Sequence, residues 1–320
     1  MIDYHWKADF TFFGLELKGL FNRDGLRLEN DPGRKYFVQG SYKFTTATKE
    51  ENALWKAREF VDDLLNVLIT GANLGFYSSF PKLVDLNVVC ENSEEIGRSG
   101  QGIPNYPRVG AYEEIQPVSI DAPTLSGYID AAGKIRSKAG QDYDRIATLL
   151  RAGVTASDEY AKFIGICRAF NALYECLIPG TSARDVDKIK MFPQKAFDRT
   201  TAKSVVDLYS KPTISGWGEM QLRLLMLGHM NILEMLSKAG LKSEKGTIDY
   251  SAELATARGS SDPFIILSSS LLCLYSVRNG VVHGSRYSYQ EVDFLYLCSL
   301  LLQEVIMNAL NIHFIRKYAI

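Results

Sequence analysis

The sequence has no excess of charge of either sign. Its 36 lysines and arginines against 37 aspartates and glutamates give a formal net charge of -1 at pH 7. Nucleic-acid binding through a global positive field is therefore excluded, and any such contact has to come from a local patch. Over 320 residues, a hydrophobic content of 46% supplies a real core, so we expect a folded chain.

Closely spaced cysteines are also lacking. The chain has an odd number of cysteines, five, and none of them forms a CxxC pair: Cys90, Cys167, Cys176, Cys273 and Cys298. None of the four histidines lies at a short spacing from a cysteine. A structural zinc site needs such pairs. We therefore expect no metal and no cofactor, and buried free thiols in a reducing, cytoplasmic compartment.

The sequence has no clean apolar run long enough to cross a bilayer, and its first residues are too polar and acidic for a secretory signal. The best membrane candidate, Phe294 to Phe314, is interrupted by Gln303, Glu304, Asn308 and Asn311. This composition is typical of a core helix, so no membrane partner is expected.

Several catalytic signatures are missing. There is no GxSxG, no HExxH and no GxxxxGK[ST], which argues against a serine hydrolase, a zinc protease and a P-loop NTPase. The glycines from Gly97 to Gly102 are spaced as in a phosphate loop, but Pro104 and Pro107 stand where the next helix should begin. Residues 93–108 are therefore predicted to be a linker.

The N-terminal part has a strand rhythm. Residues 8–46 alternate, with a polar turn at 30–33, and residues 83–90 form another predicted strand. Between them, a helix is predicted over 49–70, opened by a capping box of Thr48 and Glu51 and ended by Gly71. Residues 1–110 are thus predicted to be a small α+β domain with antiparallel strands and one long helix, followed by a connecting segment over 111–154.

The C-terminal part has a helical rhythm. Helices are predicted over 142–151, 156–177, 196–209, 217–239, 264–279 and 288–316, with a weaker, insertion-like stretch at 180–215. Residues 155–320 are expected to form an antiparallel helical bundle. The predicted fold class is an α+β N-terminal domain followed by an all-α antiparallel bundle.

A short polar break, Arg278 to Tyr287, separates two apolar helices. It contains Arg278, Asn279, His283 and two glycines, while Phe264 to Val277 carries no charge. Cleavage of RNA needs a proton taken from the 2′-hydroxyl, a proton given to the 5′-oxygen and stabilisation of charge at phosphorus. Histidine titrates near neutrality and arginine offers a planar donor fork, so these residue types suit that chemistry.

This pattern resembles the motif of the HEPN superfamily, most closely its ApeA-like branch. The resemblance rests on an Arg and a His five residues apart, a polar residue after the Arg and Gly284 after the His. The motif also lies directly before the last long helix. The resemblance covers about residues 155–316. It implies a metal-independent endoribonuclease acting on RNA, expected to be single-stranded, as a homodimer in prokaryotic defence or a toxin system. His283 would be the general base or acid, Arg278 would stabilise the phosphate, and Asn279 would orient one of them.

The spacing sets a geometric condition. Residues five apart on an unbroken helix lie about 140° from each other, so Arg278 and His283 do not point into one pocket. Either Gly280 loosens or ends the helix between them, or one pocket takes residues from two protomers. The resemblance favours two protomers, because HEPN RNases place two copies of the motif at a dimer interface.

Other residues are expected to support this site. Arg168, Asn171 and Glu175 form one polar stripe on the helix over 156–177. ApeA-like sequences usually carry an acidic residue in this helix, where this chain has Asn171, and Glu175 is a hypothetical substitute partner for Arg278. Arg286 and Tyr287 are candidates for RNA binding, with the tyrosine ring stacking on a base. Tyrosines at helix ends more often pack with the hydroxyl in water.

Two non-catalytic alternatives stay open. In the first, the motif is only a capped turn, and the bundle is a silent HEPN-like module that dimerises or binds a nucleotide. In the second, the N-terminal domain is the functional part, as a ligand sensor with a pocket lined by aromatic residues of its strands: Tyr4, Trp6, Phe10, Phe12 and Phe13. An aromatic strand face is more often core. The sequence identifies no trigger ligand and no antitoxin partner.

Overall fold

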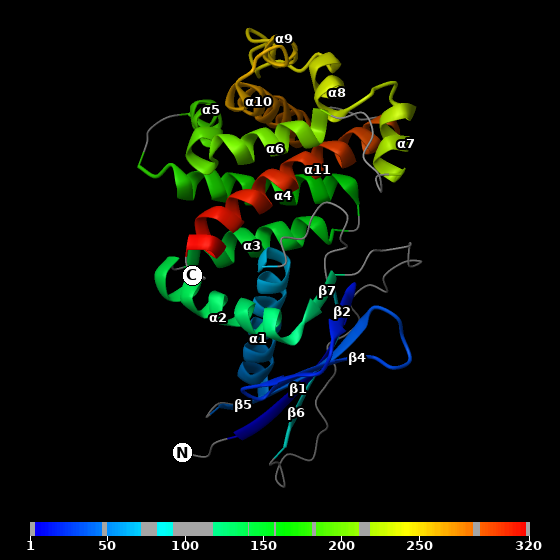
Figure 1. Ribbon diagram of the computed structural model, residues 1–320, viewed down its shortest axis with the longest axis vertical. Helices are drawn as coiled ribbons and strands as arrows, with labels where there is room; N and C mark the ends of the chain where they lie inside the picture. The colour runs from blue at the N-terminus through cyan, green and yellow to red at the C-terminus, as the bar shows by residue number, and fades with distance from the viewer. Residues whose placement is uncertain are drawn as a thin grey trace. The chain divides into compact units, whose positions relative to one another are not determined.

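The computed structural model describes residues 4–46, 50–71, 82–91, 118–139, 141–156, 158–180, 184–210, 218–283 and 289–317. These residues form two compact units, divided between Ser137 and Lys138. The first unit contains the β-sheet and the second is helical (Figure 1). A sheet-containing N-terminal part followed by a mostly helical part is what the sequence predicts.

The first unit is built on an antiparallel sheet of five strands in the order β3-β4-β5-β1-β6. The strands are β1 (Tyr4–Phe13), β3 (Phe21–Arg23), β4 (Leu26–Asn30), β5 (Phe37–Thr46) and β6 (Lys82–Cys90), and a separate parallel pair joins β2 (Leu15–Lys18) to β7 (Val118–Asp121). Along β1, Trp6, Ala8 and Phe10 are buried, whereas the residues between them are not. The predicted alternation is confirmed, and it gives the sheet one buried face.

Helix α1 (Glu50–Gly71) covers this buried face. The Phe60 ring of α1 stacks on Tyr42 of β5 with centroids 3.7 Å apart, and Tyr42 is paired with Ala8 in the sheet. The rings proposed to line a sensor pocket fill the core instead: Trp6, Phe10, Phe12 and Phe13 are each at most 4% exposed. The predicted helix is confirmed, while Thr48 of its capping box lies outside the described residues, as does the predicted linker.

The predicted connecting segment contains regular elements. Within 111–154 the structure has β7, helix α2 (Ala122–Ala139) and helix α3 (Gln141–Val154). Arg23 of β3 donates to Ser126 Oγ at 2.6 Å and to Asp130 Oδ1 at 2.7 Å, which ties α2 to the sheet. Helix α2 was not predictable by periodicity, because its apolar stripe is weak.

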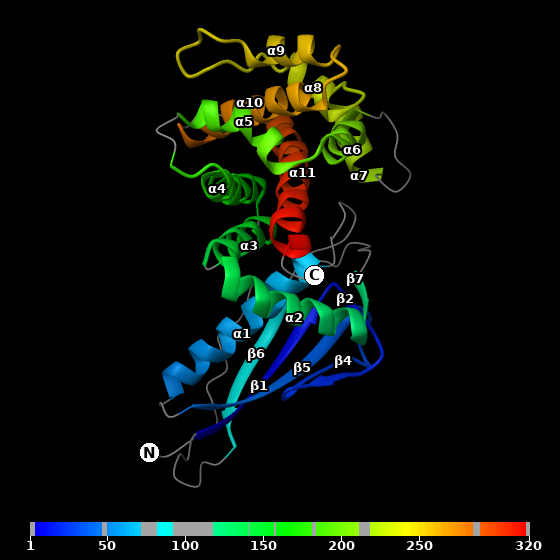
Figure 2. The same ribbon diagram turned by 60° about the vertical axis from the view of Figure 1, so that its left-hand side comes forward.

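The second unit is a helical bundle. Its further elements are α4 (Glu159–Leu177), α5 (Asp185–Ala196), α6 (Arg199–Ser210), α7 (Gly218–Met226), α8 (Ile232–Lys238), α9 (Tyr250–Ala257), α10 (Pro263–Val282) and α11 (Tyr289–Leu310), which a π-helical segment, Asn311–Arg316, extends. Helix α4 packs against both α3 and α11, and α10 packs against α5, α6 and α9 (Figure 2).

Part of the predicted helix pattern is wrong. The helix expected over 217–239 is two helices, because Gly228 has a φ of +75°, which no right-handed helix accepts, and Asn231 caps α8 by accepting from the backbone N–H of Glu234. Helices α5 and α9 were not predicted. Both are short, and α5 falls in the stretch at 180–215 where mixed charge hides the apolar stripe.

Within the described residues, two helical stretches have the length and hydropathy of a membrane span, Pro263–Val282 and Val292–Arg316. The second is 72% buried inside the protein and the first 44%. The Glu304 carboxyl of α11 accepts from Asn308 Nδ2 at 2.7 Å, and burial raises the pKa of Glu304. These properties are compatible with the core helices of a soluble protein.

Helices α3 and α4 cross at two glycines, which permits very close packing. A Cβ at Gly165 would lie 2.5 Å from the Gly153 Cα, closer than side-chain atoms approach backbone. We expect Gly165→Ala to lower the free energy of unfolding by about 2 kcal/mol, since the helices must separate. Urea unfolding measures this change.

The matched control is Gly127→Ala in α2. No atom lies within 4 Å of a Cβ at Gly127, so the higher helix propensity of alanine should raise stability by up to about 1 kcal/mol. Equal stabilities of Gly165→Ala and the unmodified chain would contradict the close crossing.

Candidate functional site

The polar break begins inside a continuous helix. Helix α10 runs through Gly280 to Val282, and the His283 backbone N–H caps it by donating to the Asn279 carbonyl at 3.0 Å. The hypothesis that Gly280 ends or loosens the helix between Arg278 and His283 is wrong. Gly284, Arg286 and Tyr287 lie outside the described residues.

Arg278 is half-buried and faces the interior of the bundle. It lines a small hollow whose other walls come from three helices, with Cys167, Phe170 and Asn171 on α4, Leu271, Leu274 and Tyr275 on α10, and Leu302 on α11. Burial raises the pKa of the Cys167 thiol, and the charge of Arg278 lowers it in part. The hollow measures about 10 Å³, the limit for one water molecule, so it admits no ligand.

Asn279 holds the Arg278 guanidinium. Arg278 Nη1 donates to Asn279 Oδ1 at 2.8 Å, and the guanidinium carbon lies 6.0 Å from the centre of the Tyr275 ring. Across the described part of the chain, no carboxylate forms an ion pair with Arg278. The positioning role predicted for Asn279 therefore has a physical basis, because a neutral amide keeps the cation in place without neutralising it.

His283 faces solvent. Its side chain is 64% exposed, and Nε2 lies 3.9 Å from Oε1 of Glu244, which is 74% exposed, a distance that supports little interaction. Arg278 thus points inward and His283 outward, as the helical spacing requires. One chain does not bring the two side chains into one pocket.

The predicted supporting residues separate into two sets. Asn171 shares the hollow with Arg278, so the structure brings these two together. The Glu175 carboxylate instead accepts from Lys188 Nζ at 2.7 and 2.8 Å, and Lys188 is only 8% exposed. Glu175 is therefore the partner of Lys188 on α5, and the hypothesis that it pairs with Arg278 is corrected.

The pairing with Lys188 predicts a stability effect. Glu175→Gln removes the charge that compensates a buried ammonium, so we expect a loss of about 1–2 kcal/mol in the free energy of unfolding. Glu175→Gln combined with Lys188→Met should recover most of this loss, because it leaves no uncompensated charge. Thermal and urea unfolding of the single and double variants give the coupling; additive losses would contradict the pairing.

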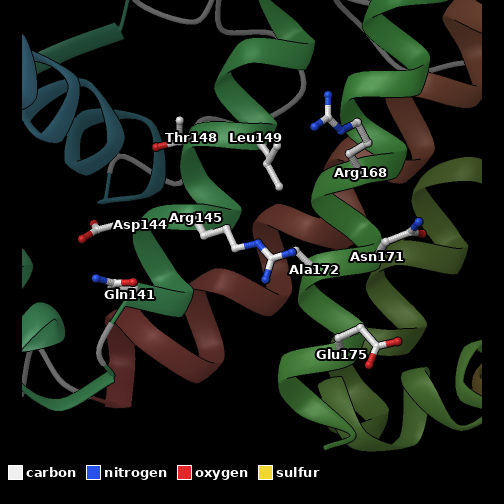
Figure 3. A pocket seen from close by; sticks show the side chains of 9 residues that line it. All are labelled: Gln141, Asp144, Arg145, Thr148, Leu149, Arg168, Asn171, Ala172 and Glu175. Atoms are coloured by element: carbon white, nitrogen blue, oxygen red, sulfur yellow. The ribbon is translucent and has the colours of Figure 1, made fainter.

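A surface groove runs along the seam between α3 and α4 (Figure 3). Its volume is about 660 Å³, and its walls are Gln141, Asp144, Arg145, Thr148 and Leu149 on α3 and Arg168, Asn171, Ala172 and Glu175 on α4. The predicted polar stripe of α4 is therefore one wall. Sequence reasoning missed Arg145; the signal was the polar spacing of Gln141, Arg145 and Thr148 on the helix that was predicted only over 142–151.

The residues with described positions contain no group of three or more His, Cys, Asp or Glu side chains arranged to hold a metal ion. The described cysteines are free thiols, and Cys167, Cys273 and Cys298 are buried.

Comparisons of this chain with protein-family models, with curated proteins and with solved structures find no match.

Proposed function

We propose that this protein is a metal-independent endoribonuclease of the HEPN type, acting on single-stranded RNA as a homodimer. One observation carries the proposal: α10 places Arg278 beside Asn171 of α4 and presents His283 to solvent at its end, just before the last long helix. This is the placement that the resemblance to ApeA-like HEPN proteins implies. A half-buried cation and an exposed imidazole on one helix end suit a site completed by a second chain.

The chemistry assigned to the site is attack by the 2′-hydroxyl. The 2′-oxygen loses its proton and forms a bond to phosphorus. The bond from phosphorus to the 5′-oxygen breaks, and the 5′-oxygen gains a proton. His283 performs one of these proton transfers. Arg278 is held by Asn279 and is only half-buried, so the accessible part of its side chain, outside the small hollow, stabilises the charge on the phosphoryl oxygens.

The homodimer follows from the opposite directions of Arg278 and His283. Each composite site would take Arg278 from one protomer and His283 from the other. Val282, next to His283, is 51% exposed and offers apolar surface for the contact between protomers. The N-terminal unit would sense a trigger or recruit substrate in a cytoplasmic defence or toxin system, where an antitoxin would restrain the nuclease.

The test is cleavage of end-labelled single-stranded RNA by the purified chain in EDTA. We expect fragments with a 2′,3′-cyclic phosphate and a 5′-hydroxyl, and a dimer by light scattering. The absence of cleavage by every active-site-intact preparation would contradict the proposal.

The second candidate is a catalytically silent module that dimerises. The observation in its favour is that Arg278 is held inside the bundle by Asn279 and lines a hollow too small for a ligand. Under this reading, Arg278→Ala and His283→Ala lower thermal stability or dimerisation together, and no preparation degrades RNA.

A further inference from the structure

The groove between α3 and α4 contains two arginines that are not occupied within the protein. Arg145 and Arg168 are exposed, and among the described residues neither guanidinium forms a hydrogen bond or an ion pair. Figure 3 shows Arg145 reaching across the seam toward Ala172, while Arg168 stands on α4 about one turn before Asn171. Two cations therefore face the same groove with their hydrogen-bond donors free.

The carboxylates of the groove do not cancel this charge. Glu175 is paired with Lys188, whose ammonium compensates it. Asp144 points in the opposite direction from Arg145 (Figure 3). The side of the groove where the guanidinium groups lie is thus positive, although the chain as a whole carries a formal charge of -1. This is the local basic patch that a neutral chain needs for binding an anion.

The walls also indicate which anion fits. A volume of about 660 Å³ is large enough for a small ligand, but the described residues that line the groove include no aromatic ring on which a base could stack. The planar guanidinium of arginine donates paired hydrogen bonds that match the oxygens of a phosphate group. A groove with two guanidinium groups and no stacking surface suits a chain of phosphodiesters, contacted through its backbone, better than a free nucleotide.

The groove is connected to the proposed catalytic motif through one residue. Asn171 lines both the groove and the hollow that contains Arg278. We infer that the groove binds the sugar–phosphate backbone of single-stranded RNA through Arg145 and Arg168, without reading its sequence. The identity of the polymer rests on the proposed function, whereas the binding of a phosphodiester chain rests on the groove itself.

The inference is tested with an RNA that the protein cannot cleave. A fluorescent 2′-O-methyl oligonucleotide lacks the attacking hydroxyl, so its binding, measured by anisotropy over a series of salt concentrations, is independent of catalysis. We expect Arg145→Gln with Arg168→Gln to weaken binding about tenfold and to reduce the slope of log K against log salt by about 1.4, the value for two lost phosphate contacts on a single strand.

The matched control removes two exposed arginines elsewhere in the same unit, Arg184→Gln with Arg316→Gln. It changes the net charge equally and should leave the affinity close to that of the unmodified chain. Circular dichroism checks that both double variants are folded.

Three outcomes would overturn the inference. The first is that the unmodified chain does not bind the oligonucleotide, and the second is that the groove variant and the control variant lose affinity equally. The third is that inorganic phosphate displaces the oligonucleotide as effectively as unlabelled RNA does, which indicates a free-phosphate site. Because the oligonucleotide is inert, loss of RNA cleavage with intact binding would count against the nuclease proposal alone.

Discussion

Replacement of His283 by alanine is expected to reduce the rate of RNA cleavage by about 10²–10⁴-fold, the usual contribution of a general acid or base. The same change should leave the melting temperature nearly unaltered. The imidazole is 64% exposed, and its distance of 3.9 Å from Glu244 indicates an interaction of little energetic value. A side chain with almost no structural role and a large effect on rate is a catalytic residue.

The measurement is the initial rate of cleavage of single-stranded RNA in EDTA, beside a thermal unfolding curve. His5→Ala is the matched control, because His5 is also an exposed histidine but lies on β1 of the first unit. His5→Ala should cleave as the unmodified chain does. If His283→Ala cleaves RNA as fast as the unmodified chain, the catalytic assignment is wrong. If no preparation cleaves RNA and His283→Ala unfolds at a lower temperature, the silent module is favoured.

Mixing two inactive variants is expected to restore activity. Arg278→Ala and His283→Ala should each be inactive alone. In a random mixture half of the dimers contain one chain of each kind, and one of their two composite sites then has both Arg278 and His283 intact. We therefore expect about a quarter of the unmodified activity, because the two-fold symmetry of a dimer distributes the residues in this way.

The expectation depends on the unbroken helix. Since α10 continues through Gly280, Arg278 and His283 stay about 140° apart on one chain. Activity after mixing, with subunit exchange confirmed by light scattering of differently tagged chains, would support a site shared by two protomers. No restoration despite exchange would mean that each chain supplies its own pair, and the composite site would have to be abandoned. The unmixed variants at the same total concentration are the control.

Much of the fold could be predicted from local patterns. The alternation of Trp6, Ala8 and Phe10 predicts a sheet with one buried face, and the apolar stripe of α1 predicts the helix on it. Both patterns are strong because one side of each element is buried. Among the elements that escaped prediction, α2 is weakly amphipathic and α9 has eight residues, so burial left little trace in their sequences. The buried positions of α5 do follow a helical spacing, but they lie among charged residues and include Pro193.

The candidate site divides in a similar way. The types and spacing of Arg278, Asn279 and His283 are properties of the sequence. The same spacing shows that an unbroken helix would point the arginine and histidine side chains in different directions. Whether Gly280 breaks the helix is a question of tertiary packing, because glycine permits both conformations and the surrounding helices select one. The structure selects the continuous helix.

The sequence by itself thus determined the order of a sheet-containing part and a helical part, and which residues could perform phosphodiester chemistry. Only the tertiary structure decided the partners of those residues: Asn171 beside Arg278, Lys188 with Glu175, and Arg145 in one groove with Arg168. Helical periodicity specifies which side chains share a face of one helix. It does not specify which face of another helix they meet, since that depends on packing between segments far apart in the chain.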